Sequence, residues 1–173
     1  TTGSANVFVG NNAGQPTTEG TYNVAIGHSA GVGTTASYNV SVGYQAGNVL
    51  TTGGNNTAVG YRALYKLITG YENVAMGNAS LELNTTGSYN VGVGDFALYN
   101  NTTASNNIAV GKDALLSNTT GDRNVAVGSL ALDANTTAAG NTAVVYQALS
   151  AVTTSENNTA MGFNALLVNT GAE

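Results

Sequence analysis

Side chains that could catalyse a reaction are few in this sequence of 173 residues, and they do not cluster. The single histidine, His28, stands at a repeat position that other copies fill with Tyr, Asn, Asp, Lys, Ser or Phe. Such variation is typical of a solvent-facing position rather than of an acid-base catalyst. Asp95, Asp113, Asp122 and Asp133 fall at different repeat positions, so no carboxylate pair is expected within the distance that glycoside hydrolysis requires. We expect no catalytic residue and no enzyme activity.

Sites for metals and cofactors are not indicated either. The chain has no cysteine, hence no thiolate metal site and no disulfide. The dipeptide Gly111-Lys112 is followed by Asp113 instead of the Ser or Thr of a phosphate-binding loop. No regular column of aspartates marks a calcium-binding repeat. We therefore expect neither a metal ion nor a cofactor.

The charge pattern also limits the partners. Only 8% of the residues are charged, and the net charge of -5 comes from scattered side chains without a block of either sign. This gives no electrostatic footprint for nucleic acid or for an anionic membrane surface. No apolar run approaches the roughly 20 residues of a membrane-spanning helix. We expect no nucleic-acid partner and no membrane insertion of this segment.

Aromatic side chains are the best candidates for ligand contacts. Tyrosines outnumber phenylalanines nine to three, and several aromatics stand near the glycine that closes a repeated phrase. Exposed rings beside amides can stack on sugars while the amides bind hydroxyl groups. The simpler interpretation, which we prefer, is that these rings shield the edges of a thin coil. The residues predicted to bind a ligand are Tyr44, Tyr61, Phe96, Tyr146 and Phe163.

The elements that must position these side chains are ten copies of one repeat. Each copy opens on an asparagine, and the copies are 17 residues apart except between Asn23 and Asn39. Nine of the ten asparagines are followed four residues later by glycine, and Val145 replaces it once. A fixed period over the whole chain predicts a repeat architecture, and we treat residues 1–173 as a single array. The anchoring residues are Asn6, Asn23, Asn39, Asn56, Asn73, Asn90, Asn107, Asn124, Asn141 and Asn158.

Each repeat begins with a short alternating segment. A β-branched residue, a small residue and a second apolar residue follow each asparagine, as in Val24-Ala25-Ile26. Large-small-large alternation predicts a strand of two unlike faces. A second small column follows after the glycine, and we interpret it as a second segment that packs over the first. The repeat ends in Asn-Thr-Thr-Gly or a variant, which is turn chemistry.

The position after the second small column changes along the chain. It is Gly14, Gly31 and Gly47 in the first three copies and leucine afterwards. This predicts a thinner core in the N-terminal third, with a sub-boundary near residues 47–53. The copy of sixteen residues has lost one between Gly31 and Tyr38, where a loop can absorb the loss.

Copies of this kind must stack to bury their apolar side chains. With one copy per coil, equivalent residues lie about 4.8 Å apart, and ten coils stand on the order of 45–50 Å tall. The stack then forms asparagine ladders at a buried corner and places glycine at the next corner, where a Cβ would obstruct the bend. The residues assigned to these ladders are Asn23, Asn56, Asn73, Asn90, Asn107 and Asn124, with Gly27, Gly60, Gly77, Gly94, Gly111 and Gly128.

Two columns of strictly small residues also suggest an oligomer. If the bulky columns fill the interior, at least one alanine column is expected to face a neighbouring chain, and three rods around a common axis would bury it. The sequence leaves open whether the valine columns or the alanine column of the strand point into the coil.

The phrase in Asn23-Val24-Ala25-Ile26-Gly27 and Asn124-Val125-Ala126-Val127-Gly128 resembles the head repeat of YadA-type trimeric autotransporter adhesins. The longer unit, as in residues 56–64, is similar to repeats of phage tail fibres and bacterial surface fibres. The resemblance implies an all-β parallel β-roll that assembles side by side into a homotrimer. The repeat here is longer than the adhesin head repeat of about 14–15 residues, so ligand residues do not carry over.

The sequence therefore predicts a non-catalytic, extracellular fibre segment of a cell or virion surface, cut from a longer array, that contacts a glycan or a host surface protein. A phage tail-fibre shaft is the alternative with the same shape. An ice-binding β-solenoid that uses the paired threonines, such as Thr85-Thr86 and Thr119-Thr120, is the alternative of another class.

Overall fold

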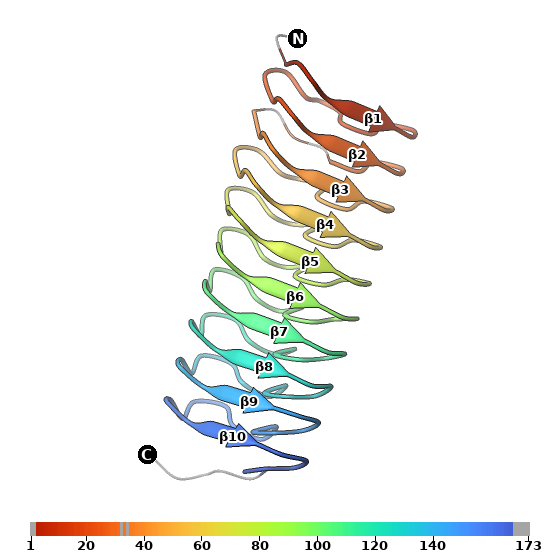
Figure 1. Cartoon of the computed structure of the whole chain (residues 1–173). Helices are drawn as coiled ribbons and strands as arrows, with labels where there is room; N and C mark the ends of the chain where they lie inside the picture. Colours follow the sequence, from red (N-terminus) through yellow and green to blue (C-terminus); the bar gives the residue numbers. More distant parts are fainter. Residues whose placement is uncertain (1–2, 32, 34, 168–173) are drawn as a thin grey trace.

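The computed structural model describes residues 3–31, 33 and 35–167. In these residues the chain forms ten short strands in one parallel sheet, ordered as in the sequence. Each coil adds one strand, so the molecule is a rod of stacked coils (Figure 1). This confirms the predicted parallel β-solenoid with one repeat per coil. The strands are β1 (Val7–Val9), β2 (Val24–Ile26), β3 (Val40–Val42), β4 (Thr57–Val59), β5 (Val74–Met76), β6 (Val91–Val93), β7 (Ile108–Val110), β8 (Val125–Val127), β9 (Thr142–Val144) and β10 (Thr159–Met161).

The sheet register is set by the repeat. Val74 pairs with Val91, and the same equivalent pairing runs from β1 to β10. The single shorter step is absorbed in a turn. Thr35 N donates to Thr51 O, 16 residues on, whereas Ala36 O and Gly53 O, 17 apart, occupy equivalent positions as acceptors for Asn23 and Asn39. The missing residue is thus the second threonine of the turn, at the place where the sequence predicted a loop.

The second segment of each coil is not a strand. Two of its residues have positive φ in every coil, as with Arg62 (φ 52) and Leu64 (φ 50) in the fourth. Left-handed residues cannot continue a strand. Hydrogen bonds between neighbouring coils persist, for example from Leu64 N to Ser80 O at 3.1 Å. The segment therefore packs over the strand as predicted, but as a series of turns.

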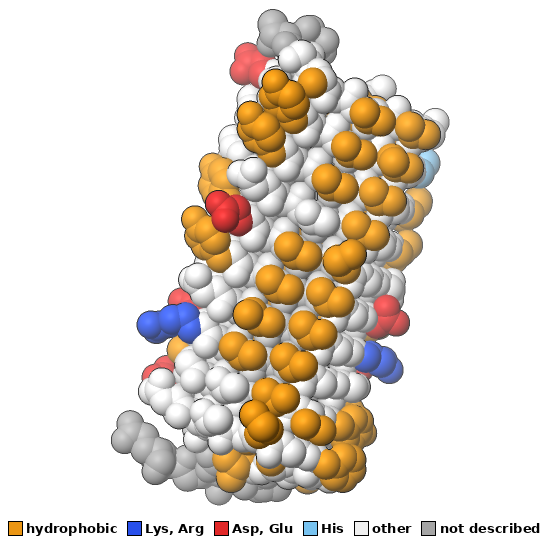
Figure 2. Space-filling model, in the orientation of Figure 1, with side chains coloured by type: hydrophobic (Ala, Val, Ile, Leu, Met, Phe, Trp, Pro, Cys, Tyr) orange, Lys and Arg blue, Asp and Glu red, His pale blue; other side chains and the backbone are white. Residues whose placement is uncertain are grey.

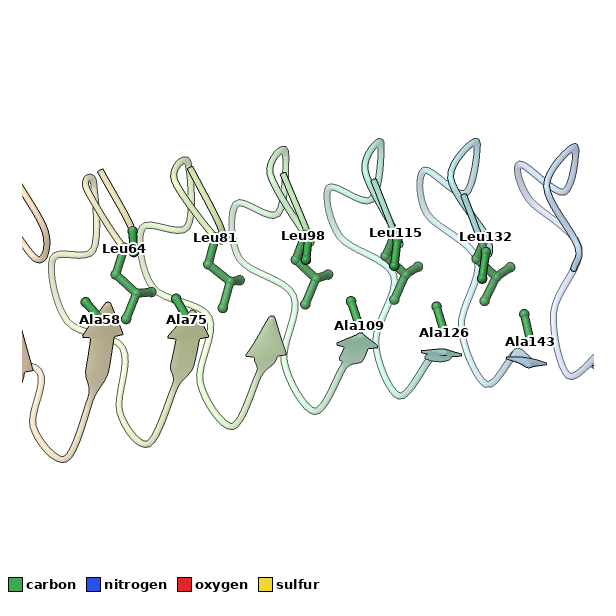
Figure 3. Close-up of a cluster of buried hydrophobic side chains, with 14 of the residues drawn as sticks. Ala58, Leu64, Ala75, Leu81, Leu98, Ala109, Leu115, Ala126, Leu132 and Ala143 are labelled. Carbon is green, nitrogen blue, oxygen red and sulfur yellow. The ribbon is translucent and has the colours of Figure 1, made fainter. Parts of the chain in front are cut away.

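The alanine of each strand points into the coil. Ala75, Ala109 and Ala126 are fully buried, and so are the alanines of the second small column from Ala30 to Ala148 and the leucines from Leu64 to Leu149. Leu81, Leu98 and Leu115 lie across the interior from the strand alanines (Figure 3). The expectation that an alanine column faces a neighbouring chain is therefore wrong. Leucines on one wall leave room only for a methyl group on the other.

Exceptions in the core are compensated by glycine. Where the strand carries Ser41 instead of alanine, a Cβ at Gly47 would lie 2.5 Å from the Ser41 hydroxyl. Where the second small column carries Ser80, the strand of the next coil has Gly92, and a Cβ there would lie 2.5 Å from Ser80 Oγ. The interior around Ser80 and Gly92 is thus filled to its limit, and the atom added in one column is balanced by one removed from the other.

The N-terminal coils have less side-chain volume in the core. Gly31 stands where later coils carry a buried leucine, and a cavity of about 10 Å³ lies nearby, about the volume that the centre of one water molecule requires. The residues lining it include Asn23, Asn39, Ser41 and Leu50. This agrees with the thinner core that the switch from glycine to leucine predicts.

The predicted asparagine ladder lies at a buried corner. Asn56 illustrates its pattern: its Oδ1 accepts from Asn73 N at 2.9 Å, and its Nδ2 donates to Gly70 O at 2.9 Å. The same bonds recur from Asn23 to Asn141, and these asparagines are buried. Each amide therefore satisfies backbone groups of two neighbouring coils.

A second ladder was not recognised from the sequence, where its asparagines were assigned to turn chemistry. One inward column carries Leu50 and Leu67, then four fully buried asparagines, then Val152. The amides of the four bond to one another, at 3.2, 3.0 and 2.8 Å. The signal in the sequence is that the turn asparagine occupies four consecutive copies, which a ladder requires. The four residues are Asn84, Asn101, Asn118 and Asn135.

The glycine column forms the next corner, as predicted. Gly94 has φ +131, and a Cβ there would lie 2.6 Å from the carbonyl oxygen of Gly111. The described glycines of this column have φ values near that of Gly94, whereas Val145 has φ 89. Valine at positive φ is strained, by about 1–2 kcal/mol.

Val145→Gly is accordingly expected to stabilise the protein by about 1 kcal/mol, because it removes this strain. The expected readout is a higher urea midpoint with an unchanged slope. Val144→Gly, one residue earlier in β9, is the control and should destabilise, since glycine weakens a strand where φ is ordinary. A lower midpoint for Val145→Gly would contradict the strain.

Candidate functional site: an apolar strip on the sheet

Because the strand alanines point inward, the bulky residues on either side of them point outward. Ile26 is 40% exposed, Met76 44% and Val127 37%. Their side chains form two parallel columns along the outer face of the sheet (Figure 2). We call these columns the strip. Its residues are Val7, Val9, Val24, Ile26, Val40, Val42, Thr57, Val59, Val74, Met76, Val91, Val93, Ile108, Val110, Val125, Val127, Thr142, Val144, Thr159 and Met161.

The strip is large for a surface left to water. Ten rungs at about 4.8 Å and a width of about 10 Å give roughly 500 Å². A soluble monomer rarely exposes a larger continuous apolar patch, and patches of this size are often functional. The strip carries no charged residue. It is therefore the candidate functional surface among the described residues.

Two borders flank the strip. The Asn-side border consists of the residue before each repeat asparagine: Ala5, Tyr22, Tyr38, Asn55, Glu72, Tyr89, Asn106, Arg123, Gly140 and Asn157. The Gly-side border consists of the residue after each corner position: Asn11, His28, Tyr44, Tyr61, Asn78, Asp95, Lys112, Ser129, Tyr146 and Phe163. Charged side chains lie on both sides of the two apolar columns (Figure 2).

Four of the five predicted ligand residues belong to the Gly-side border. Tyr44 and Tyr61 stack at 5.5 Å between ring centroids, and Tyr146 and Phe163 stack at 5.5 Å near the other end. Phe96 does not belong to this column, because Asp95 occupies the place after Gly94. Phe96 instead meets Tyr99 edge to face at 5.6 Å. The structure therefore divides the predicted set into three separate places.

Stacking limits what these rings can do. His28 stacks on Tyr44 at 5.3 Å, so Tyr44 has one ring against each of its two faces. A sugar that stacks on an aromatic side chain needs an open face. Within this group, only the outer faces of His28 and Tyr61 remain for such a contact. The hydroxyl groups and ring edges stay available to a partner that approaches from the side.

The acidic residues do not form a common site. Asp95 Oδ1 accepts from Asn78 N at 3.3 Å, Asp122 Oδ1 accepts from Ser105 N at 2.6 Å, and Lys112 lies 3.6 Å from Asp113. These carboxylates bond to their own neighbours instead of converging on a ligand. Among the described residues, no group of three or more acidic or histidine side chains could hold a metal ion.

One ion pair lies on the side of the coil away from the strip. Arg62 Nη2 is 3.0 Å from Glu82 Oε1, and the Arg62 guanidinium lies 4.2 Å from the centroid of the Tyr65 ring. Glu82 is buried. The cluster joins the fourth coil to the fifth, which is a structural role.

The paired threonines form a hydrogen-bonded turn. In five pairs the first threonine donates its hydroxyl to a backbone carbonyl of the next coil, as from Thr85 Oγ1 to Thr102 O at 3.0 Å. The second, such as Thr86 or Thr120, is exposed. Only one of the two hydroxyl columns is therefore left for water, which weakens the case for an ice-binding face made of threonine pairs.

Comparisons with known proteins do not assign a function to this surface. No protein-family model, no curated protein and no solved structure matches the chain. Within the described part of the chain there is no helix of the length and apolar character needed to cross a membrane. The molecule is a parallel β-solenoid of repeats of about 17 residues.

Proposed function

We propose that this protein is a non-catalytic segment of an extracellular fibre, and that its rods associate side by side through the strip. The proposal rests chiefly on one observation, the two outward columns of Val, Ile, Met and Thr along the sheet. Burying them in a second copy removes apolar area from water at about 25 cal/mol per Å². The proposed role is mechanical, because a rod of regularly stacked coils holds the parts of the fibre at its two ends a fixed distance apart.

The assembly we propose is a homotrimer of parallel chains, as the resemblance to trimeric surface fibres implies. Three flat apolar faces around one axis cover one another completely, and a closed ring leaves no face open for further growth. The fibre would stand on a bacterial surface or on a virion, and a phage tail-fibre shaft remains the alternative with the same shape. The aromatic residues outside the contact would meet a glycan or a host surface protein.

Charges on the strip are expected to separate association from folding. Val110→Glu with Val127→Glu should reduce the mass in solution to that of one chain, because two carboxylates per copy cannot enter an apolar interface. Circular dichroism of the variant should be unchanged, since both side chains already point outward. Sedimentation equilibrium measures the mass.

Thr103→Glu with Thr120→Glu is the matched control for this experiment. Both threonines are exposed in turns away from the strip, so the control should keep the mass of the parent protein. A parent protein that is monomeric at all concentrations would refute self-association. Thermal hysteresis in that monomer would then support the ice-binding alternative, whereas glycan-array binding tests the adhesive role directly.

A further inference from the structure

We infer that the two borders of the strip meet in the assembly, so that the Asn-side border of one copy packs on the Gly-side border of the next copy at the same coil. The inference rests on the proposed side-by-side association. It assigns Tyr22 and Tyr38 of one copy to His28 and Tyr44 of the next as the central contact.

The dimensions of the sheet favour this contact. From the residue before the asparagine to the residue after the glycine there are six steps along the chain, at most about 20 Å. Three such faces form a triangular prism, and each sheet lies about 6 Å or less from the axis. This distance from the axis is close to about 5 Å, which is half the usual spacing of two sheets packed face to face, so the three sheets would be in contact at the axis. Four faces would lie about 10 Å from the axis and leave a channel.

The corners of such a prism are the two borders. The chain bends there, because Tyr38 has φ 62 and the glycines after the strands have φ above 130. Rotation about an axis parallel to the rod does not change height, so each coil meets the same coil of its neighbour. Residue pairs across the corner are therefore fixed by the numbering alone.

Aromatic residues occupy both borders at the same height. Tyr22 stacks on Tyr38 at 5.1 Å on one border, and His28 stacks on Tyr44 at 5.3 Å on the other. These four residues belong to the second and third coils, and all are exposed in the single chain. A parallel assembly places one stack against the other and covers these four exposed rings.

Charged residues fit the same arrangement. At equal height Glu72 faces Asn78, Tyr89 faces Asp95, and Asn106 faces Lys112. Arg123 likewise faces Ser129. Every charged border residue thus meets a neutral side chain that can donate or accept a hydrogen bond, and no like charges meet.

One rival arrangement is an antiparallel pair of chains with a two-fold axis between the sixth and seventh coils. It would set Glu72 beside Arg123 and Asp95 beside Lys112. However, it brings like borders together, so the stack of Tyr22 and Tyr38 does not meet the stack of His28 and Tyr44. Ion pairs at the rim of an interface contribute little to affinity, so the observations favour the parallel arrangement.

Disulfide cross-linking tests the inference, because the chain has no cysteine of its own. Tyr38→Cys with Tyr44→Cys should give a covalent trimer on oxidation, seen on a denaturing non-reducing gel. The two positions lie on opposite borders of one chain, too far apart for the Cα distance of about 4.4–6.8 Å that a disulfide needs. Tyr38→Cys with Asn78→Cys, two coils apart in height, is the control and should not link.

The outcomes separate this inference from the proposed function. A trimeric mass without the 38–44 link, or with a 38–78 link instead, overturns the border contact and leaves self-association standing. A covalent dimer of a Glu72→Cys/Arg123→Cys variant overturns it in favour of the antiparallel pair. A monomeric protein overturns both. Covalent trimers from 38–44 alone support the parallel contact.

Discussion

Ala126→Leu is expected to destabilise the protein by about 3 kcal/mol, the upper part of the usual range for an overpacked core. Ala126 is fully buried, and its partners in the sheet are Ala109 and Ala143. Leu115 and Leu132 lie across the interior from this column (Figure 3). A leucine side chain has no space there unless two neighbouring coils move apart. Urea unfolding followed by circular dichroism measures the loss.

Val127→Leu is the matched control, one residue away on the opposite face. Its side chain points outward, so the free energy of unfolding should change by no more than about 0.5 kcal/mol. Similar losses for the two variants would mean that the faces of β8 are assigned wrongly. Coils contact only their immediate neighbours, so part of the array could unfold separately. The full destabilisation by Ala126→Leu is therefore measured when the whole array unfolds in one step.

Asn56→Ala is expected to cost about 4 kcal/mol, through two buried groups left without partners. Asn56 Oδ1 accepts from Asn73 N, and its Nδ2 donates to Gly70 O. In this coil the second inward column carries Leu67, which cannot replace the lost donor. The substitution therefore leaves Asn73 N without its acceptor and Gly70 O without its donor.

Asn107→Ala makes a sharp comparison, with an expected cost of about 2 kcal/mol. Asn107 Nδ2 donates to Gly121 O at 2.9 Å, but Asn118 of the second ladder donates to the same oxygen at 3.0 Å. Only the acceptor for Asn124 N is lost outright. Chemical unfolding of both variants gives the difference, and Asn78→Ala outside the ladders serves as the neutral control. Equal losses in the free energy of unfolding for the two variants would show that Asn118 does not compensate for the missing donor to Gly121 O.

Much of the fold follows from local sequence features that recur in each of the ten copies of the repeat. The alternation in Val74-Ala75-Met76 predicts a strand, and the period predicts that β5 pairs with its equivalents on both sides. Asparagine and glycine each have a chemistry that only a corner uses, namely amide ladders and positive φ. The missing residue of the short copy was also placed correctly, since only a turn tolerates such a loss.

The candidate site was harder to predict than the fold. The aromatic residues Tyr44 and Tyr61 were identified as one column, but Phe96 was added to it although it is one residue further along the chain. The strip itself was described as two bulky columns without being recognised as the surface. The compensating pair of Ser80 and Gly92 was a usable signal, because such an exchange is needed only where both residues face the core.

The sequence by itself determined the number of coils, the register of the sheet and the residues at the corners, because each of these depends on a repeated local pattern. Only the tertiary structure decided which face of the strand is buried. An alternation with a period of two residues shows that the strand has two unlike faces, but it does not show which of them is buried. The segment opposite the strand decides this, because Leu98 and its equivalents fill the thin interior and leave space only for alanine. The same constraint turns the valines outward, and with them the surface on which the proposed association depends.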